Sequence, residues 1–227
     1  MSTKYTLSNY NSTFEVKGSF YSIYIAKIGL IKCRNILTIC RKNDSNHIQE
    51  DAIFVMMNPG SSKPKKGSNY GKIYTLNNFV KNGGHTINNL VDADPDNVHL
   101  YTMEIMDIKG WNKVIIVNLS DIREADSSKF KKKYRKIMKH INNKNLQTIT
   151  SIFNSNRNER NIIFNNTTDV VVCWGANNPQ YMTNDAIKFF NNNNITIKGL
   201  KAKKKYGYLY LKPRGRADKV NELVKVI

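Results

Sequence analysis

The chain has 227 residues, of which 36 are Lys or Arg and 17 are Asp or Glu, so its formal net charge is +19. Hydrophobic residues make up 40% of it, which excludes collagen-like and wholly disordered classes and is enough for one packed domain. Three cysteines are too few for a disulfide framework or a four-thiolate cluster. No window approaches the roughly 18 uninterrupted apolar residues of a membrane span, and the first residues lack the apolar run of a signal peptide. We therefore expect one cytoplasmic domain over residues 1–227, with no membrane association, no metal and no cofactor.

The charge makes a polyanion the first candidate partner, with nucleic acid ahead of an anionic membrane surface. The competing explanation is an A·T-rich genome, because Asn, Lys and Ile abound throughout the chain, as in the run Asn191–Asn194. The positions of the cations are therefore more informative than their number.

In chain order, residues 1–50 are expected to form a β extension. Thr13–Ile28 and Asn35–Arg41 alternate with a period near two, which predicts two antiparallel strands. The apolar run Asp51–Met57 ends in turn residues and predicts a buried parallel strand. Ile73–Lys81 is expected to be the next helix, and residues 82–110 are expected to be rich in loops.

Strands and helices continue to alternate in the second half. The expected strands are Lys113–Val117, Asp169–Trp174 and Tyr206–Leu211. The expected helices are Ser127–Ile141, capped by Asp126 or Ser127, then Tyr181–Asn191 and Ala217–Val226, with helix and loop mixed over residues 142–166. Four repeats of strand, loop and helix predict an α/β three-layer sandwich with a central, mostly parallel four-stranded sheet. In open sheets of this class, ligands bind beyond the carboxyl ends of the strands.

The residues that follow these strands form an ordered series of motifs. The series is Met57-Asn58-Pro59-Gly60, Tyr70 twelve residues after Asn58, Asn118, Trp174-Gly175 and Lys212-Pro213-Arg214-Gly215-Arg216. In this order and spacing the motifs resemble those of the uracil-DNA glycosylase superfamily. They are more closely similar to domain-of-unknown-function family 1643, and the resemblance covers roughly residues 35–227.

The resemblance implies a glycosylase that extracts uracil from DNA and hydrolyses its N-glycosidic bond. Asn58 would position the water, and since an amide is a weaker base than the Asp found in the superfamily, a modest rate is expected. Met57, Pro59 and Gly60 would border the base, Tyr70 would stack on it, and Asn118 would read its N3–H donor and O4 acceptor. Lys212 takes the place of the superfamily's His and would stabilise the charge on the leaving base.

Each of these residues also has a structural interpretation. Asn58 and Asn118 are residue types that commonly end strands in turns, Tyr74 competes with Tyr70 as the stacking aromatic, and Lys212 is equally suited to a phosphate contact. Trp174 is expected to belong to the core. Arg214 or Arg216 takes the place where the superfamily inserts an apolar wedge into the duplex, and no Leu stands there. Single-stranded DNA is therefore expected to be an easier substrate than duplex. In the Asp-Pro-Tyr form of the superfamily motif, the Tyr side chain blocks the methyl group of thymine. Gly60 stands at that place here and leaves the space open, so poor selectivity against thymine is expected unless another residue fills it.

The cations fall into three groups. Two groups include residues at the proposed site. Lys63, Lys65 and Lys66 follow Asn58, next to Ser61 and Ser62; Lys198, Lys201 and Lys203–Lys205 precede the last strand, and Lys212, Arg214 and Arg216 follow it, with Gly215 between the arginines. We expect the residues of the Asn58 and Lys212 loops to contact DNA phosphates. The third group, Lys129–Lys133 with Arg135, Lys136 and Lys139, is interpreted as a solvated helix face.

The expected function is thus base excision of uracil from DNA by a monomer. One alternative is a DNA-binding protein on the same scaffold with weak or no catalysis. The other is an enzyme that acts on a different modified base or on a free nucleotide. A P-loop NTPase is excluded because the chain contains no GxxxxGK[ST] sequence.

Overall fold

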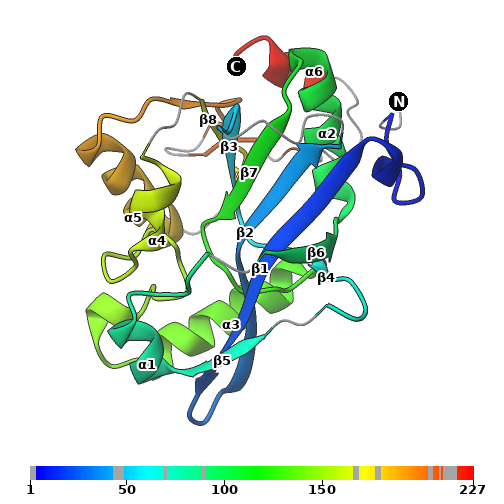
Figure 1. Cartoon of the computed structure of the whole chain (residues 1–227). Helices are drawn as coiled ribbons and strands as arrows, with labels where there is room; N and C mark the ends of the chain where they lie inside the picture. The colour runs from blue at the N-terminus through cyan, green and yellow to red at the C-terminus, as the bar shows by residue number, and fades with distance from the viewer. Residues whose placement is uncertain are drawn as a thin grey trace.

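A computed structural model describes residues 4–42, 49–68, 71–87, 90–165, 169–176, 180–203, 207–209, 211 and 219–227, with the side chains of residues 180 and 181 excepted. The chain is an α/β protein with one large sheet and helices on both of its faces (Figure 1). The strands are β1 (Phe14–Ile25), β2 (Gly29–Arg41), β3 (Ala52–Met56), β4 (Lys63–Pro64), β5 (Lys72–Thr75), β6 (Val91–Asp94), β7 (Lys113–Asn118), β8 (Val170–Val172) and β9 (Ile197–Lys198). The α-helices are α1 (Leu76–Lys81), α2 (Asn97–Lys109), α3 (Ser127–His140), α4 (Glu159–Ile163), α5 (Gln180–Asn192) and α6 (Lys219–Val224), and Tyr10–Ser12 and Lys144–Leu146 form 3-10 turns.

Four neighbouring strands, β7, β3, β8 and β9, run parallel to one another. β3 comes first in the chain but lies in space between β7 and β8, and β9 follows β8. Met56, the last residue of β3, lies opposite Asn118, the last residue of β7. The carboxyl ends of β3 and β7 therefore lie side by side. The expected α/β class is present, but the sheet of the described residues is larger than the four strands expected and mixed, because it has nine strands joined by both parallel and antiparallel pairs.

Alternate residues of the central strands point into two separate hydrophobic clusters, one on each face of the sheet. Ile53 and Val55 of β3 join the cluster that receives α3 and α5, whereas Phe54 of β3 joins the cluster that receives α2 and α6. Because both faces of β3 are covered, all five of its residues are buried, which explains its unbroken apolar sequence.

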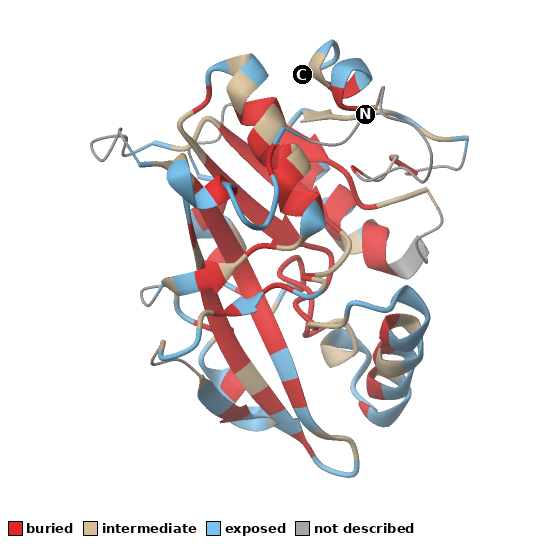
Figure 2. Ribbon diagram, turned by 90° about the vertical axis from the view of Figure 1, so that its right-hand side faces the viewer, coloured by how far each residue is buried: buried red, intermediate tan, exposed pale blue. Residues whose placement is uncertain are grey.

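The N-terminal strands form a long antiparallel hairpin that continues the sheet. β1 and β2 pair from Phe14 opposite Arg41 to Ile25 opposite Gly29, as expected from their alternation. β7 pairs only with residues 36–40 of β2, so the distal half of the hairpin extends beyond the parallel strands. Figure 2 shows the buried and exposed residues along this hairpin. β1 and β2 are thus an integral part of the sheet rather than an appendage.

Three expectations from the sequence are wrong. Residues 82–110 were expected to be loop-rich but contain the 13-residue helix α2, which begins after Asp96 in a capping box with His99. Ile73–Lys81 is divided, because β5 extends to Thr75 and α1 begins at Leu76. The fourth parallel strand is β9 rather than Tyr206–Leu211, of which the described part makes only isolated bridges, from Tyr208 to Gly175 and Lys201.

β2 begins at Gly29, six residues before the expected Asn35, and the short strands β4 and β6 were not expected. The other expected elements agree with the structure to within a few residues. α3 begins after Asp126, whose carboxylate accepts hydrogen bonds from the backbone of Ser128 and Lys129. α5 and the described part of α6 also lie where they were expected. Among the residues that the structure describes, no helix is long and apolar enough to cross a membrane.

Candidate functional site

Asn58 lies half-buried just beyond the end of β3, and its side chain is held by the segment that follows β7. Its Nδ2 atom donates to the carbonyl oxygen of Glu124 at 2.7 Å and to that of Ile122 at 3.4 Å. These two bonds fix the orientation of the amide and do not use its Oδ1 atom. A residue with an amide nitrogen suits this position, because both facing groups are acceptors.

The loop after Asn58 turns at Gly60, which has a φ of +62°. A Cβ atom at this position would collide with the Oδ2 atom of Asp96, the residue that caps α2. Glycine is therefore favoured here by the left-handed backbone, and any larger residue would also displace the Asp96 carboxylate from its position at the cap of α2.

Asn118 is the last residue of β7, and its side chain is fully buried. Its amide is assigned the orientation in which both polar atoms face a complementary partner: the nitrogen then donates to the Asn58 carbonyl oxygen at 3.2 Å, and the oxygen accepts from Nη2 of Arg34 at 3.2 Å. The structure thus brings together Asn58 and Asn118, two of the residues expected beyond the carboxyl ends of the parallel strands. The donor and the acceptor of Asn118 both have partners inside the protein, so reading a base requires at least one of these bonds to exchange.

The other residues of the Asn58 loop differ in their access to solvent. Met57 is half-buried, Pro59 is buried, and Ser61, Lys63 and Lys66 are exposed, with Lys65 half-buried. Ser62 is buried, and its hydroxyl donates to the carbonyl oxygen of Asp94 at 2.9 Å. Of the two serines expected to contact phosphate, Ser61 is therefore the accessible one.

Several predicted site residues lie outside the described residues: Tyr70, Lys212, Arg214, Gly215 and Arg216. The rival stacking residue, Tyr74, is buried, and its hydroxyl lies 2.9 Å from Nδ1 of His85. Trp174 is a core residue as expected, packed edge-on against Tyr208. Cys173 is buried as well, and its burial raises the pKa of the thiol to about 12, which keeps it unreactive.

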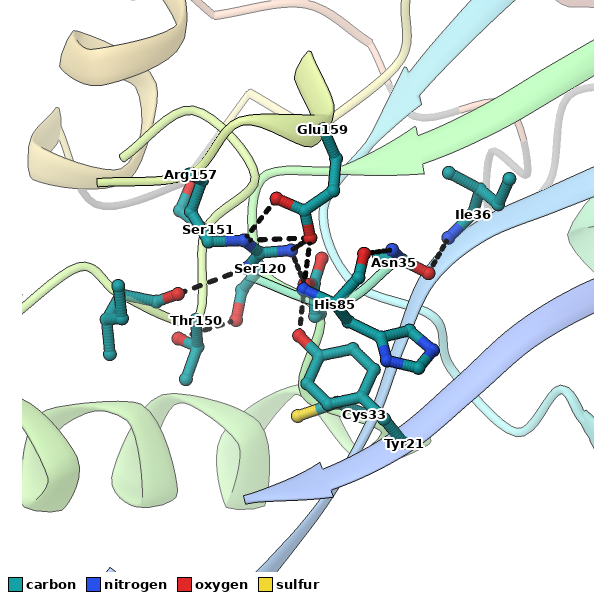
Figure 3. A network of polar contacts seen from close by, with 12 residues as sticks. Tyr21, Cys33, Asn35, Ile36, His85, Ser120, Thr150, Ser151, Arg157 and Glu159 are labelled. Carbon is teal, nitrogen blue, oxygen red and sulfur yellow. Dashed lines mark hydrogen bonds and ion pairs between the residues drawn. The ribbon is translucent and has the colours of Figure 1, made fainter. Parts of the chain in front are cut away.

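A buried charged cluster close to this site was not predicted from the sequence (Figure 3). Nη2 of Arg157 lies 2.8 Å from Oδ2 of Asp121 and 2.7 Å from Oε1 of Glu159. The Tyr21 hydroxyl donates to Asp121 at 2.5 Å, and the His85 backbone N–H donates to Glu159 at 2.7 Å. The cluster joins the hairpin, the end of β7 and two loops that are far apart in the sequence.

Burial governs the titration of this cluster. It raises the pKa of Asp121 to about 6, although Arg157 and Tyr21 act in the opposite direction. Burial also acts to raise the pKa of Glu159, but the charge and hydrogen bonds of Arg157 outweigh it, so that pKa is lowered. The pKa of His85 falls to about 4 because its burial disfavours the cation. Since the groups are buried and bonded to one another, we interpret the cluster as a structural clamp rather than a substrate site.

No protein-family model, curated protein or solved structure matches the chain. Any function assigned to it has to come from its own residues and their geometry.

Proposed function

We propose that the chain binds uracil-containing DNA and hydrolyses the N-glycosidic bond of deoxyuridine, in the manner of the uracil-DNA glycosylase superfamily that its motifs resemble. The observation that supports this most is the 3.2 Å contact between the Asn118 amide and the Asn58 carbonyl oxygen. The two residues to which the resemblance assigns the water and the base come from neighbouring parallel strands and meet at one edge of the sheet.

Asn58 acts in this proposal through its Oδ1 atom. The Glu124 and Ile122 carbonyls hold Nδ2, so the amide is oriented before substrate arrives, and Oδ1 accepts a hydrogen bond from the attacking water. The water oxygen forms a bond to C1′ while the bond from C1′ to N1 of uracil breaks, and the electron pair stays on the uracil. An amide does not take up the proton of the water, which passes to solvent or to the leaving base. Positioning without a strong base supports a slow reaction.

The leaving base and the DNA backbone need cations. Lys212 is proposed to stabilise the uracil anion, and the exposed Lys63 and Lys66 beside Asn58 are proposed to contact phosphates. The segment 212–216 has no apolar side chain to insert into a duplex except Pro213. A single strand, whose bases need no unpairing, is therefore the proposed preferred substrate.

A second candidate function is DNA binding without catalysis. It is favoured by the fully buried Asn118 amide, which is bonded on one side to Asn58 and on the other to Arg34. If these bonds persist when DNA binds, the protein has no amide with which to read uracil.

The two candidates are separated by incubating the full chain with a single-stranded oligonucleotide that contains one uracil, followed by alkaline cleavage at abasic sites. The variant Asn58→Ala tests the site, and Asn156→Ala is its control, since Asn156 is also half-buried and donates to a carbonyl oxygen. Cleavage by the wild type and by Asn156→Ala, but not by Asn58→Ala, supports the glycosylase. DNA binding without cleavage supports the second candidate, and the absence of both activities rejects both proposals.

A further inference from the structure

The helix α3 carries the densest positive charge in the described chain. Its 14 residues include six lysines and one arginine and no acidic residue. The face formed by Phe130, Tyr134 and Ile137 is buried in the same hydrophobic cluster as the distal half of the β1–β2 hairpin, which α3 crosses in Figure 1. Packing therefore accounts for one face of this helix and leaves its charged face to be explained.

Four of the lysines, Lys129, Lys132, Lys136 and Lys139, form what we call the lysine stripe. Their spacings of three, four and three residues place them along one side of the helix. That side is opposite the buried face, and all four residues are exposed. At a rise of about 1.5 Å per residue, the stripe is about 15 Å long.

Nothing in the described fold requires this stripe. Within the described ranges, none of its four ammonium groups forms an ion pair, and the helix makes a single one, from Lys133 to Glu124 at 3.4 Å. Like charges three and four residues apart destabilise a helix by about 0.2–0.5 kcal/mol per pair. Lys129 lies near Asp126 and Lys139 lies in the last turn, where a cation is favourable, but the neighbouring lysines of the stripe still repel one another, and a ligand that neutralises them would relieve that repulsion.

The stripe is also linked to the candidate site. Glu124 accepts a hydrogen bond from Asn58 through its backbone carbonyl and pairs with Lys133 of α3 through its side chain. The amide that is proposed to hold the water and the first turns of α3 are therefore anchored on the same residue. Lys129, at the amino-terminal end of the stripe, lies five residues after Glu124 in the chain.

We propose that the lysine stripe binds the phosphate backbone of a nucleic-acid strand, without regard to its sequence, and delivers that strand to the Asn58 loop. The identification of the strand as DNA rests on the proposed function, whereas the phosphate binding does not. A linear row of four cations matches a linear polyanion, whose phosphates lose their counterions on binding. A membrane surface is a poorer match, because a basic helix that lies on a membrane inserts its apolar face, and that face of α3 is already buried.

The test measures the affinity of the full chain for a uracil-free single-stranded oligonucleotide as a function of salt concentration. The stripe variant replaces Lys129, Lys132, Lys136 and Lys139 with Gln. A control variant has the same change of charge, because Gln replaces four exposed lysines that lie outside α3, namely Lys42, Lys81, Lys188 and Lys225. A third variant, with Arg at the four stripe positions, keeps the charge, and thermal melting verifies that every variant is folded.

We expect the stripe variant to lose about three units of the slope of log affinity against log salt, which reduces its affinity relative to wild type about 50-fold more at 50 mM than at 200 mM salt. The control and Arg variants should keep the wild-type slope. An unchanged slope in the stripe variant, or an equal loss in the control, overturns the proposal. Stripe-dependent binding to anionic lipid vesicles with unchanged oligonucleotide binding also overturns it.

Release of uracil is measured separately with the same proteins. Stripe-dependent binding without uracil release rejects the proposed glycosylase and leaves the phosphate-binding surface standing. Uracil release together with an unchanged salt slope in the stripe variant rejects the phosphate-binding stripe and leaves the proposed glycosylase standing. The two failures are therefore distinguishable.

Discussion

The side-chain amide of Asn118 donates to the backbone carbonyl oxygen of Asn58 at 3.2 Å, while the side chain of Asn58 donates to the Glu124 carbonyl at 2.7 Å. Two amides thus fasten the loop after β3 to the end of β7 and the segment that follows it. One donates from Asn118 to the loop, and the other donates from the loop to Glu124. This arrangement holds the Asn58 loop in one position before any ligand binds.

The first prediction concerns Asn58→Asp. A carboxylate at this position would face the carbonyl oxygens of Glu124 and Ile122, so two hydrogen bonds become repulsive contacts between acceptors. We expect the free energy of unfolding at pH 7 to fall by about 1–3 kcal/mol. It should fall less at pH 4, because the two carbonyl oxygens favour the protonated form of the new side chain, which can donate to one of them. Urea denaturation at both pH values measures this, and a variant as stable as wild type at pH 7 would show that the amide is not held as described.

The second prediction concerns Arg157→Met. The change leaves the buried Asp121 and Glu159 without the cation that both of them contact, and breaking a buried ion pair from one side costs about 3–5 kcal/mol. Adding Glu159→Gln to this variant should restore part of the loss, because it removes one of the two unpaired carboxylates. The exposed Arg135→Met is the control and should change stability by less than about 0.5 kcal/mol. Equal urea midpoints for the Arg157 and Arg135 variants would refute the clamp.

The third prediction concerns acidic pH. Burial lowers the pKa of His85 and of His99 to about 4, whereas histidine in an unfolded chain has a pKa near 6.5. Between these values the unfolded state binds more protons, so stability decreases as the pH is lowered from about 6.5 to 4. Asp121, whose pKa is raised to about 6, acts in the opposite direction between about pH 6 and 4, and two histidines outweigh it. The urea midpoint should therefore be lower at pH 4.5 than at pH 7, and a flat or inverted profile would contradict the buried neutral histidines.

The fourth prediction concerns the stability of α3. Replacing Lys129, Lys132, Lys136 and Lys139 with Gln removes like-charge repulsion, and Gln and Lys have similar helix propensities. We expect the melting temperature of the DNA-free protein to rise at low salt and the gain to shrink at high salt. A decrease at low salt would mean that these lysines stabilise the fold, contrary to the absence of ion pairs at the stripe within the described residues.

The sequence was most informative where burial leaves a simple pattern. β3 and β7 are covered on both faces, so each is an unbroken apolar run that ends at a turn. The rule that ligands bind beyond the carboxyl ends of parallel strands then identified Asn58 and Asn118 as candidate residues, and the structure brings them together. α2 was missed because seven of its residues, from Val98 to Met106, are buried on several sides, which removes the periodicity that identifies an amphipathic helix.

Other features depend on contacts that no local pattern encodes. β9 has two residues, too few for a periodicity to show. Arg157 contacts Asp121 across 36 positions, and Tyr21 contacts Asp121 across 100. The contact of Arg34 with Asn118 joins β2 to β7 in the same way. Such pairs are brought together by the packing of the sheet and its loops, so they are visible only in the folded structure.

The central claim is that Asn58 positions water for the release of uracil. Its most direct test is single-turnover quantification of free uracil, by mass, from a single-stranded oligonucleotide carrying one deoxyuridine. The wild-type chain should release uracil and leave an abasic strand, and Asn58→Ala should bind the strand with the same affinity but release none. A wild-type protein that binds the strand and leaves the uracil attached, or an Asn58→Ala variant that releases uracil at the wild-type rate, would contradict it.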